Sequence, residues 1–107
     1  MSIKSLQLLR NKDCNLWTSA LEILKKILKE NKIGIRLEVI LIEDDEMAKK
    51  YKFFGSPQIN INNADIDPDS KKMTSYHESG CRIYIWKNNV YEGPPKEMIE
   101  AALNQVM

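Results

Sequence analysis

Residues 51–63 read Tyr-Lys-Phe-Phe-Gly-Ser-Pro-Gln-Ile-Asn-Ile-Asn-Asn, and this stretch contributes most to the fold that we expect. An apolar pair runs into Gly55, Ser56 and Pro57, and the alternating residues after them predict a strand over residues 58–62. Proline suits the first position of a strand, because it has no amide hydrogen to donate inside a sheet. An X-Pro bond can also be cis at modest cost, which gives a sharp turn of fixed shape. The stretch therefore predicts a turn that leads directly into a strand.

The size and charge of the chain narrow the classes of function. A length of 107 residues suits a single domain, which we expect to span residues 1–107. The net charge is +1 and acids and bases are interspersed, so nucleic acid is not an expected partner. No segment approaches the roughly 20 apolar residues of a membrane span, and the apolar run at residues 6–9 is too short for a signal peptide. We expect a cytoplasmic protein that binds no membrane.

The hydrophobic pattern predicts alternating strands and helices. Strands are expected over residues 3–9, 35–42, 58–62 and 82–86, with a hairpin turn at 88–89, and helices over 16–28, 43–51 and 94–106. We expect the first two strands to lie inside the sheet, and Asp13 or Asn15 to cap the first helix. The polar stretch 63–80 lacks periodicity and predicts a long loop. This order predicts an α/β fold, a mixed sheet of four to five strands flanked by about three helices.

Cys14 is the first candidate for chemistry, because it lies between a predicted strand and the first turn of a helix. Unpaired amides and the helix dipole there favour the thiolate, which is the reactive form of cysteine. Asp13 acts in the opposite direction. A dithiol enzyme would carry its second cysteine where this chain has Trp17, so exchange requires Cys81, a substrate thiol or glutathione. Alternatively, Cys14 is a small apolar residue packed under the helix.

Cys81 is the second candidate, and it precedes Arg82 at the start of the second pair of strands. Arg82 suits binding of an anion or a lowered thiol pKa, although alternation along a strand sends the two side chains to opposite faces. His77 with Cys14 and Cys81 gives a possible three-ligand site for a soft metal, but the spacing alone is weak evidence, so no metal or cofactor is expected. In a reducing cytosol a transient Cys14–Cys81 disulfide would indicate redox function.

Three patches of the sequence resemble one family. Residues 13–21, Asp-Cys-Asn-Leu-Trp-Thr-Ser-Ala-Leu, resemble a Gly-Cys-Pro-Asn-Trp motif followed by a helix. Residues 54–66 resemble a Phe-Gly-Ser-Pro-Thr strand and its turn, and residues 81–84 with 93–95 resemble a Cys-Arg-x-Tyr motif and a closing segment. Together, and in this order, they are similar to the small thioredoxin-like proteins related to alkylmercury lyase. The patches are spread over nearly the whole chain.

The resemblance implies a thioredoxin-like fold in which the Pro57 turn sits against Cys14. It has departures, because Asn15 replaces the proline after the cysteine and Asn63 stands where a turn glycine is usual. Alkylmercury lyase cleaves carbon–mercury bonds with two distant cysteines and an aspartate. Cys14 and Cys81 match the cysteine pair, but Trp17 stands where the aspartate belongs. Without that proton donor, lyase activity is not expected.

The leading hypothesis is a thiol–disulfide oxidoreductase in which Cys14 attacks and Cys81 resolves the mixed species. Its partners would be protein or small-molecule thiols and disulfides, with Trp17, Ser56, Pro57 and Arg82 as the residues that bind the substrate. One alternative is a non-catalytic module of the same fold that holds a peptide at the edge of the strand after Pro57. Another is a protein that handles soft metals or organomercury. Whether the two cysteines come within roughly 7 Å of each other, as a disulfide requires of their Cα atoms, is left open by the sequence.

Overall fold

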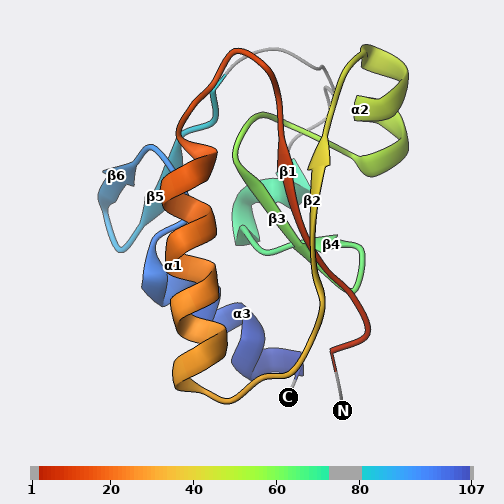
Figure 1. Ribbon diagram of the computed structural model, residues 1–107. Coiled ribbons are helices and arrows are strands. Elements are labelled where there is room, and N and C mark those ends of the chain that lie inside the picture. Colours follow the sequence, from red (N-terminus) through yellow and green to blue (C-terminus); the bar gives the residue numbers. More distant parts are fainter. Residues whose placement is uncertain (1–2, 73–80, 107) are drawn as a thin grey trace.

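The computed structural model describes residues 3–72 and 81–106, and Figure 1 shows how its elements are arranged. In this part of the chain a four-stranded sheet has the order β2-β1-β3-β4. Its strands are β1 (Leu6–Arg10), β2 (Leu37–Leu41), β3 (Gln58–Ile61) and β4 (Ala64–Asp65). β1 pairs in parallel with β2 and antiparallel with β3, and β3 pairs antiparallel with β4. The expected α/β architecture with a mixed sheet is confirmed.

The described residues form three α-helices, as the hydrophobic periodicity predicts. These are α1 (Trp17–Glu30), α2 (Asp45–Tyr51) and α3 (Lys96–Val106). α1 and α3 contact each other and pack against the same core cluster, whereas α2 packs against a separate one. Figure 1 shows α2 at the upper end of the sheet, away from α1 and α3.

The larger core cluster joins the sheet to α1 and α3. Leu6 and Leu8 of β1 stand opposite Ile61 and Ile59 of β3, so these four side chains share one face of the sheet. The apolar faces of the two helices cover them, with buried residues Ala20, Leu24, Ile27, Leu28, Met98, Ile99 and Leu103. Burial of such side chains stabilises the fold by roughly 1.5–3 kcal/mol each. This cluster fixes the position of α1, whose first turn follows Cys14.

The smaller core cluster belongs to the opposite face of β1. Leu9 alternates with Leu8 along the strand, and it packs with Ile42, Ala48 and Phe53. Ala48 lies in α2, and Phe53 follows that helix directly. The cluster therefore holds α2 and the start of the Gly-Ser-Pro turn against the sheet.

The hairpin near the C-terminus forms a sheet of its own. β5 (Tyr84–Trp86) pairs antiparallel with β6 (Asn89–Tyr91), and this two-stranded sheet is separate from the main one. The turn is formed by Lys87 and Asn88 and not by the expected residues 88–89, because Asn89 pairs with Trp86 as the first residue of β6. The two turn residues have φ of 50° and 67°, as a two-residue turn of type I′ requires. An isolated parallel bridge between Ser56 and Cys81 connects the approach to β5 with the Gly-Ser-Pro turn.

Three further local expectations are corrected. β2 lies at the edge of the sheet rather than inside it, and Val39 is 44% exposed. Neither Asp13 nor Asn15 caps α1 through its side chain, because Leu16 occupies the N-cap position and no side-chain hydrogen bond caps the helix there. The stretch 63–80 is not one long loop, because it contains β4 and the short 3-10 helix η1 (Pro68–Lys72), while residues 73–80 lie outside the described part.

An aspartate caps the start of α2. The Asp44 carboxylate accepts a hydrogen bond from the Met47 amide at 2.8 Å, which is the side-chain cap that an aspartate supplies at this position. Among the described residues, no helix combines the length and the apolar character needed to cross a bilayer.

Candidate functional site

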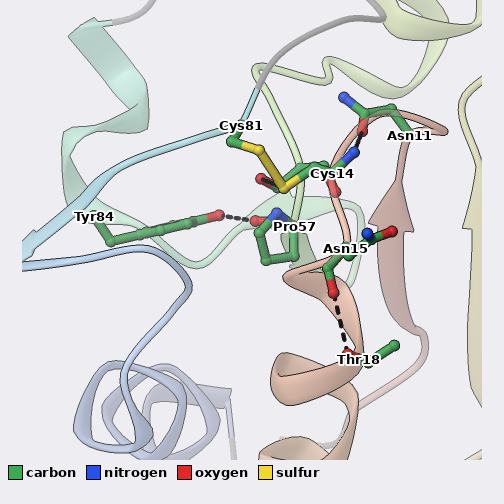
Figure 2. Close-up of a disulfide and its surroundings, with 8 residues drawn as sticks. Asn11, Cys14, Asn15, Thr18, Pro57, Cys81 and Tyr84 are labelled. Atoms are coloured by element: carbon green, nitrogen blue, oxygen red, sulfur yellow. Dashed lines mark hydrogen bonds between the residues drawn. A yellow bond between two sulfur atoms is a disulfide. The ribbon is translucent and has the colours of Figure 1, made fainter.

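A disulfide joins Cys14 to Cys81, two residues separated by 67 positions in the sequence. Their Cα atoms are 5.7 Å apart, within the range that such a bond needs. Cys14 lies in the turn between β1 and α1, and Cys81 lies at the start of the segment that leads into β5. Figure 2 shows the sulfur–sulfur bond beside Pro57. The structure therefore answers the question that the sequence leaves open.

Cys14 is buried, with only 2% of the residue exposed. Its amide donates to Oδ1 of the buried Asn11 at 3.0 Å. Its sulfur lies 3.6 Å from the carbonyl oxygen of Ser56. A disulfide sulfur has no proton to give, so this is a contact in the oxidised state. After reduction, the Cys14 thiol at this position would be a donor to that oxygen.

The turn beside Cys14 is built around Gly55, Ser56 and Pro57. The Ser56–Pro57 peptide bond is cis, and both residues are buried. Gly55 has φ of +148°, which side-chain-bearing residues rarely adopt, and a Cβ there would lie 3.0 Å from the Cβ of Arg82. Glycine is therefore required both by the backbone conformation and by the close approach of the Cys81 segment.

The segment of residues 81–84 occupies the backbone that we expected to bind a substrate. The Arg82 amide donates to the Ser56 carbonyl at 2.9 Å. The Tyr84 hydroxyl donates to the Pro57 carbonyl, and Figure 2 shows the ring directed toward it. Burial raises the pKa of Tyr84, so its hydroxyl stays protonated and remains a donor. The carbonyl oxygens of Ser56 and Pro57 thus accept hydrogen bonds from residues of the same protein.

Arg82 lies in the interior, next in sequence to an exposed cysteine. Its guanidinium contacts Asp65 at 2.6 Å, Asp67 at 3.1 Å and the Gln58 side-chain oxygen at 3.0 Å. The Arg82 side chain is 3% exposed and lies over the Tyr84 ring, 4.5 Å from its centroid. Among the described residues, the acceptors of the Arg82 guanidinium, which the sequence predicts as a substrate-binding group, are side chains of this protein.

Burial affects the charged forms of Asp65 and Arg82 differently. Burial raises the pKa of Asp65, and the hydrogen bond from Arg82 offsets only part of that effect. Burial alone would lower the pKa of Arg82, but the interactions with Tyr84, Asp65 and Asp67 together outweigh it and raise the pKa. Arg82 therefore remains a cation, whereas the ionised form of Asp65 is disfavoured on balance.

The two cysteines differ in their access to solvent. Cys81 is exposed, and Ile83 and Ile85 on the same side of the segment are 63% and 56% exposed. Arg82 and Tyr84, which alternate with them, are buried. The expected alternation between Cys81 and Arg82 is therefore present. Of the two bonded cysteines, Cys81 is therefore the one exposed to solvent.

Trp17 takes part in the packing of the core. It is half-buried against the larger core cluster, and the Arg10 guanidinium lies 4.3 Å from the centroid of its ring. Trp86 is also half-buried and donates through Nε1 to Glu97 at 3.1 Å. His77, the third residue of the possible metal site, lies outside the described residues.

Sequence reasoning missed the partners of Arg82 and the role of Asn11. Asp65 and Asp67 are spaced by two in a stretch that lacks helical periodicity, so they were assigned to a loop. One signal was available: alternation turns Arg82 inward, and a buried arginine requires carboxylates or other acceptors. Asp65, Asp67 and Asp69 are acids at alternate positions, and the first two are the partners of Arg82.

Comparison with known protein families gives a match over most of the chain. The model of a domain of unknown function, DUF2703, matches residues 10–103, a range that includes both cysteines, the Gly-Ser-Pro turn and most of α3. Neither a curated protein nor a solved structure matches the chain.

Proposed function

The chain belongs to the DUF2703 family, and we propose that it is a thiol–disulfide oxidoreductase of thioredoxin-like fold that uses Cys14 and Cys81. The observation that carries the proposal is the disulfide between a buried cysteine at the start of α1 and an exposed cysteine on a separate segment. A bond between one exposed cysteine and one buried cysteine is suited to exchange, because an attacking thiolate must reach the bond from solvent.

The architecture supports the thioredoxin-like part of this proposal. The first strand leads into a turn with Cys14 and then into α1, and a cis-proline turn leads into the neighbouring antiparallel strand. The sulfur of Cys14 lies against the residue that precedes Pro57. This is the juxtaposition that the resemblance to thioredoxin-like proteins implies.

The difference in exposure between the two cysteine residues favours an order of attack opposite to the one that the sequence suggests. A substrate thiolate attacks the Cys81 sulfur, the sulfur–sulfur bond breaks, and Cys14 leaves as a thiolate that takes up a proton. A second substrate thiolate then attacks the substrate sulfur in the mixed disulfide, which releases Cys81. The protein disulfide gains two electrons and two protons, and two substrate thiols become one disulfide. In the reverse direction, the Cys81 thiolate attacks the substrate disulfide and Cys14 resolves the mixed species.

Cys14 has the environment of a leaving group. The first turn of α1 directs unpaired amides and the positive end of the helix dipole toward the residues that precede it. A thiol that leaves as a stabilised thiolate leaves faster. Asp13 is exposed, so solvent screens most of its opposing charge.

Trapping the mixed disulfide tests this order. Cys14→Ser and Cys81→Ser variants are each treated with glutathione disulfide, and the adduct is followed by mass spectrometry. We expect glutathione to add to Cys81 in the Cys14→Ser protein at least tenfold faster than to Cys14 in the Cys81→Ser protein. Equal or faster reaction at Cys14 would restore the order suggested by the sequence. No adduct on either folded variant would contradict a redox function.

The proximity of the sulfurs also supports capture of a soft metal by the reduced pair as a second candidate. Two thiolates on residues whose Cα atoms are 5.7 Å apart can ligate one soft cation together. We would expect stoichiometric Hg²⁺ binding to the reduced protein, lost when either cysteine is replaced by serine. The non-catalytic peptide-binding alternative receives less support, because residues 81–84 already bond to the carbonyls of Ser56 and Pro57.

A further inference from the structure

We infer that Arg82 is a positioning residue for the redox pair: its buried contacts with Asp65 and Asp67 hold Cys81 beside Cys14 and so set how easily the disulfide is reduced. The inference rests on the proposed function only for its biological use, since the reduction equilibrium can be measured whether or not the protein exchanges thiols with a partner.

The first step is that the contacts of Arg82 with Asp65 and Asp67, which we call the anchor, do not involve the disulfide. Arg82 reaches the carboxylate of Asp65 on β4 and that of Asp67, which follows β4. Its backbone amide separately donates to Ser56. None of these bonds is made by a sulfur atom, so reduction of the disulfide leaves all of them available.

The second step is that the anchor is stiff. The guanidinium is 3% exposed and has three oxygen acceptors, Asp65, Asp67 and Gln58, which fix its plane. Gln58 is itself held, because its side-chain oxygen also accepts from the Phe54 amide at 2.9 Å. Charge-assisted hydrogen bonds of this kind are short and directional, and they are stronger away from water.

The third step connects the anchor to the equilibrium. Arg82 is covalently next to Cys81, so fixing Arg82 restricts where the Cys81 sulfur can go after reduction. Two thiols on a flexible connection meet at an effective concentration in the millimolar range, whereas groups held in place reach far higher values. A higher effective concentration favours the disulfide over the two thiols. Arg82 therefore makes the pair harder to reduce.

The close approach of the Cys81 segment to the Gly-Ser-Pro turn agrees with this role. The Cβ position at Gly55 lies 3.0 Å from Arg82, so the backbone at Gly55 and the backbone at Arg82 are packed without space for a methyl group. This packing, together with the bridge from Ser56 to Cys81, places the anchor directly beside the bond that it influences.

The test is a redox titration against defined mixtures of reduced and oxidised glutathione, with the fraction of disulfide measured after thiol labelling. In Arg82→Gln, which removes the charge, we expect the equilibrium constant for disulfide formation to fall at least tenfold, or about 30 mV for a two-electron couple. Arg82→Lys should give a smaller fall, because an ammonium cannot engage both carboxylates as the planar guanidinium does. Asp67→Asn, which keeps Arg82 and one carboxylate, should also give a smaller fall.

The matched control is Leu103→Ala in the core of α3, far in sequence from this cluster and 2% exposed. It should lower the free energy of unfolding but leave the equilibrium constant within twofold of the wild type. Arg82→Gln with an unchanged equilibrium constant would overturn the inference and make Arg82 a purely structural residue. If that variant does not fold, an unchanged constant in both Arg82→Lys and Asp67→Asn would overturn it in the same way. If glutathione forms no adducts in the trapping experiment, the titration is run with reduced and oxidised dithiothreitol instead, so that failure counts against the proposed function and not against this inference.

Discussion

At the scale of single residues, the site depends on positions where chemistry and backbone geometry leave little choice. Gly55 combines a φ of +148° with a close approach to Arg82, and Asp65 is a carboxylate whose charge is disfavoured by burial. A substitution at each of these two positions gives a testable prediction.

Gly55→Ala should destabilise the protein by about 1–3 kcal/mol, because the new methyl group meets the Arg82 side chain and the backbone conformation is unfavourable for alanine. Gly34→Ala is the control, since a Cβ there meets nothing within 4 Å. The measurement is urea denaturation of both variants and the wild type. Equal effects at the two positions would show that the approach at Gly55 is not tight.

Asp65→Asn should change how stability depends on pH. Since burial raises the pKa of Asp65 above its ordinary 3.8, the folded state holds this proton more tightly than the unfolded state does. Asp65 therefore contributes a term that lowers the free energy of unfolding as pH rises from 3.8 through the raised pKa. Removing the carboxylate should remove that term. Denaturation at several pH values checks this, and identical pH profiles for wild type and variant would contradict it.

At the scale of secondary-structure elements, the sequence predicts the helices better than it predicts the placement of strands. The apolar faces of α1 and α3 repeat over several turns, and the structure has both helices where the pattern puts them. β2 is as rich in branched apolar residues as an inner strand, yet it pairs only with β1 among the described strands. Its position depends on which strand pairs with which, and that is decided by contacts far apart in the sequence.

The same reason explains what could be known of the site in advance. Cys14 and the Gly-Ser-Pro turn were recognisable because each sits at a boundary with a local signature. Asp65 lies in β4, only two residues long, whose local pattern is too short to distinguish it from a loop. Cys14 and Cys81 are 67 positions apart, so their pairing depends on the path of the chain between them and no local pattern contains it.

The caps of the helices give an element-scale prediction. Asp44→Ala should cost about 1 kcal/mol, because it removes the acceptor of the Met47 amide at the start of α2. Asp13→Ala should have little effect, since Asp13 is exposed and α1 begins after Leu16 without a side-chain cap. Thermal unfolding of the two variants compares them directly. A larger loss in Asp13→Ala would restore the cap that the sequence suggested.

At the scale of the whole molecule, the disulfide ties the start of α1 to the segment that leads into the β5–β6 hairpin. Closing a loop of 67 positions stabilises the folded state by about 4 kcal/mol through the entropy of the unfolded chain. Reduction should therefore lower the free energy of unfolding by up to that amount while the two core clusters hold the fold together. Urea denaturation with and without a reductant measures the difference, and no difference would show that the bond does not constrain the unfolded chain.

The most direct test of the central claim is the reduction potential of the Cys14–Cys81 pair in the wild-type protein. A pair that exchanges with other thiols should have a potential in the range of known exchange proteins, about −120 to −270 mV. Equilibration with glutathione or dithiothreitol, followed by thiol labelling and mass spectrometry, gives this value. A potential in that range is the result we predict. A potential below about −300 mV would mark a structural disulfide and contradict the redox function.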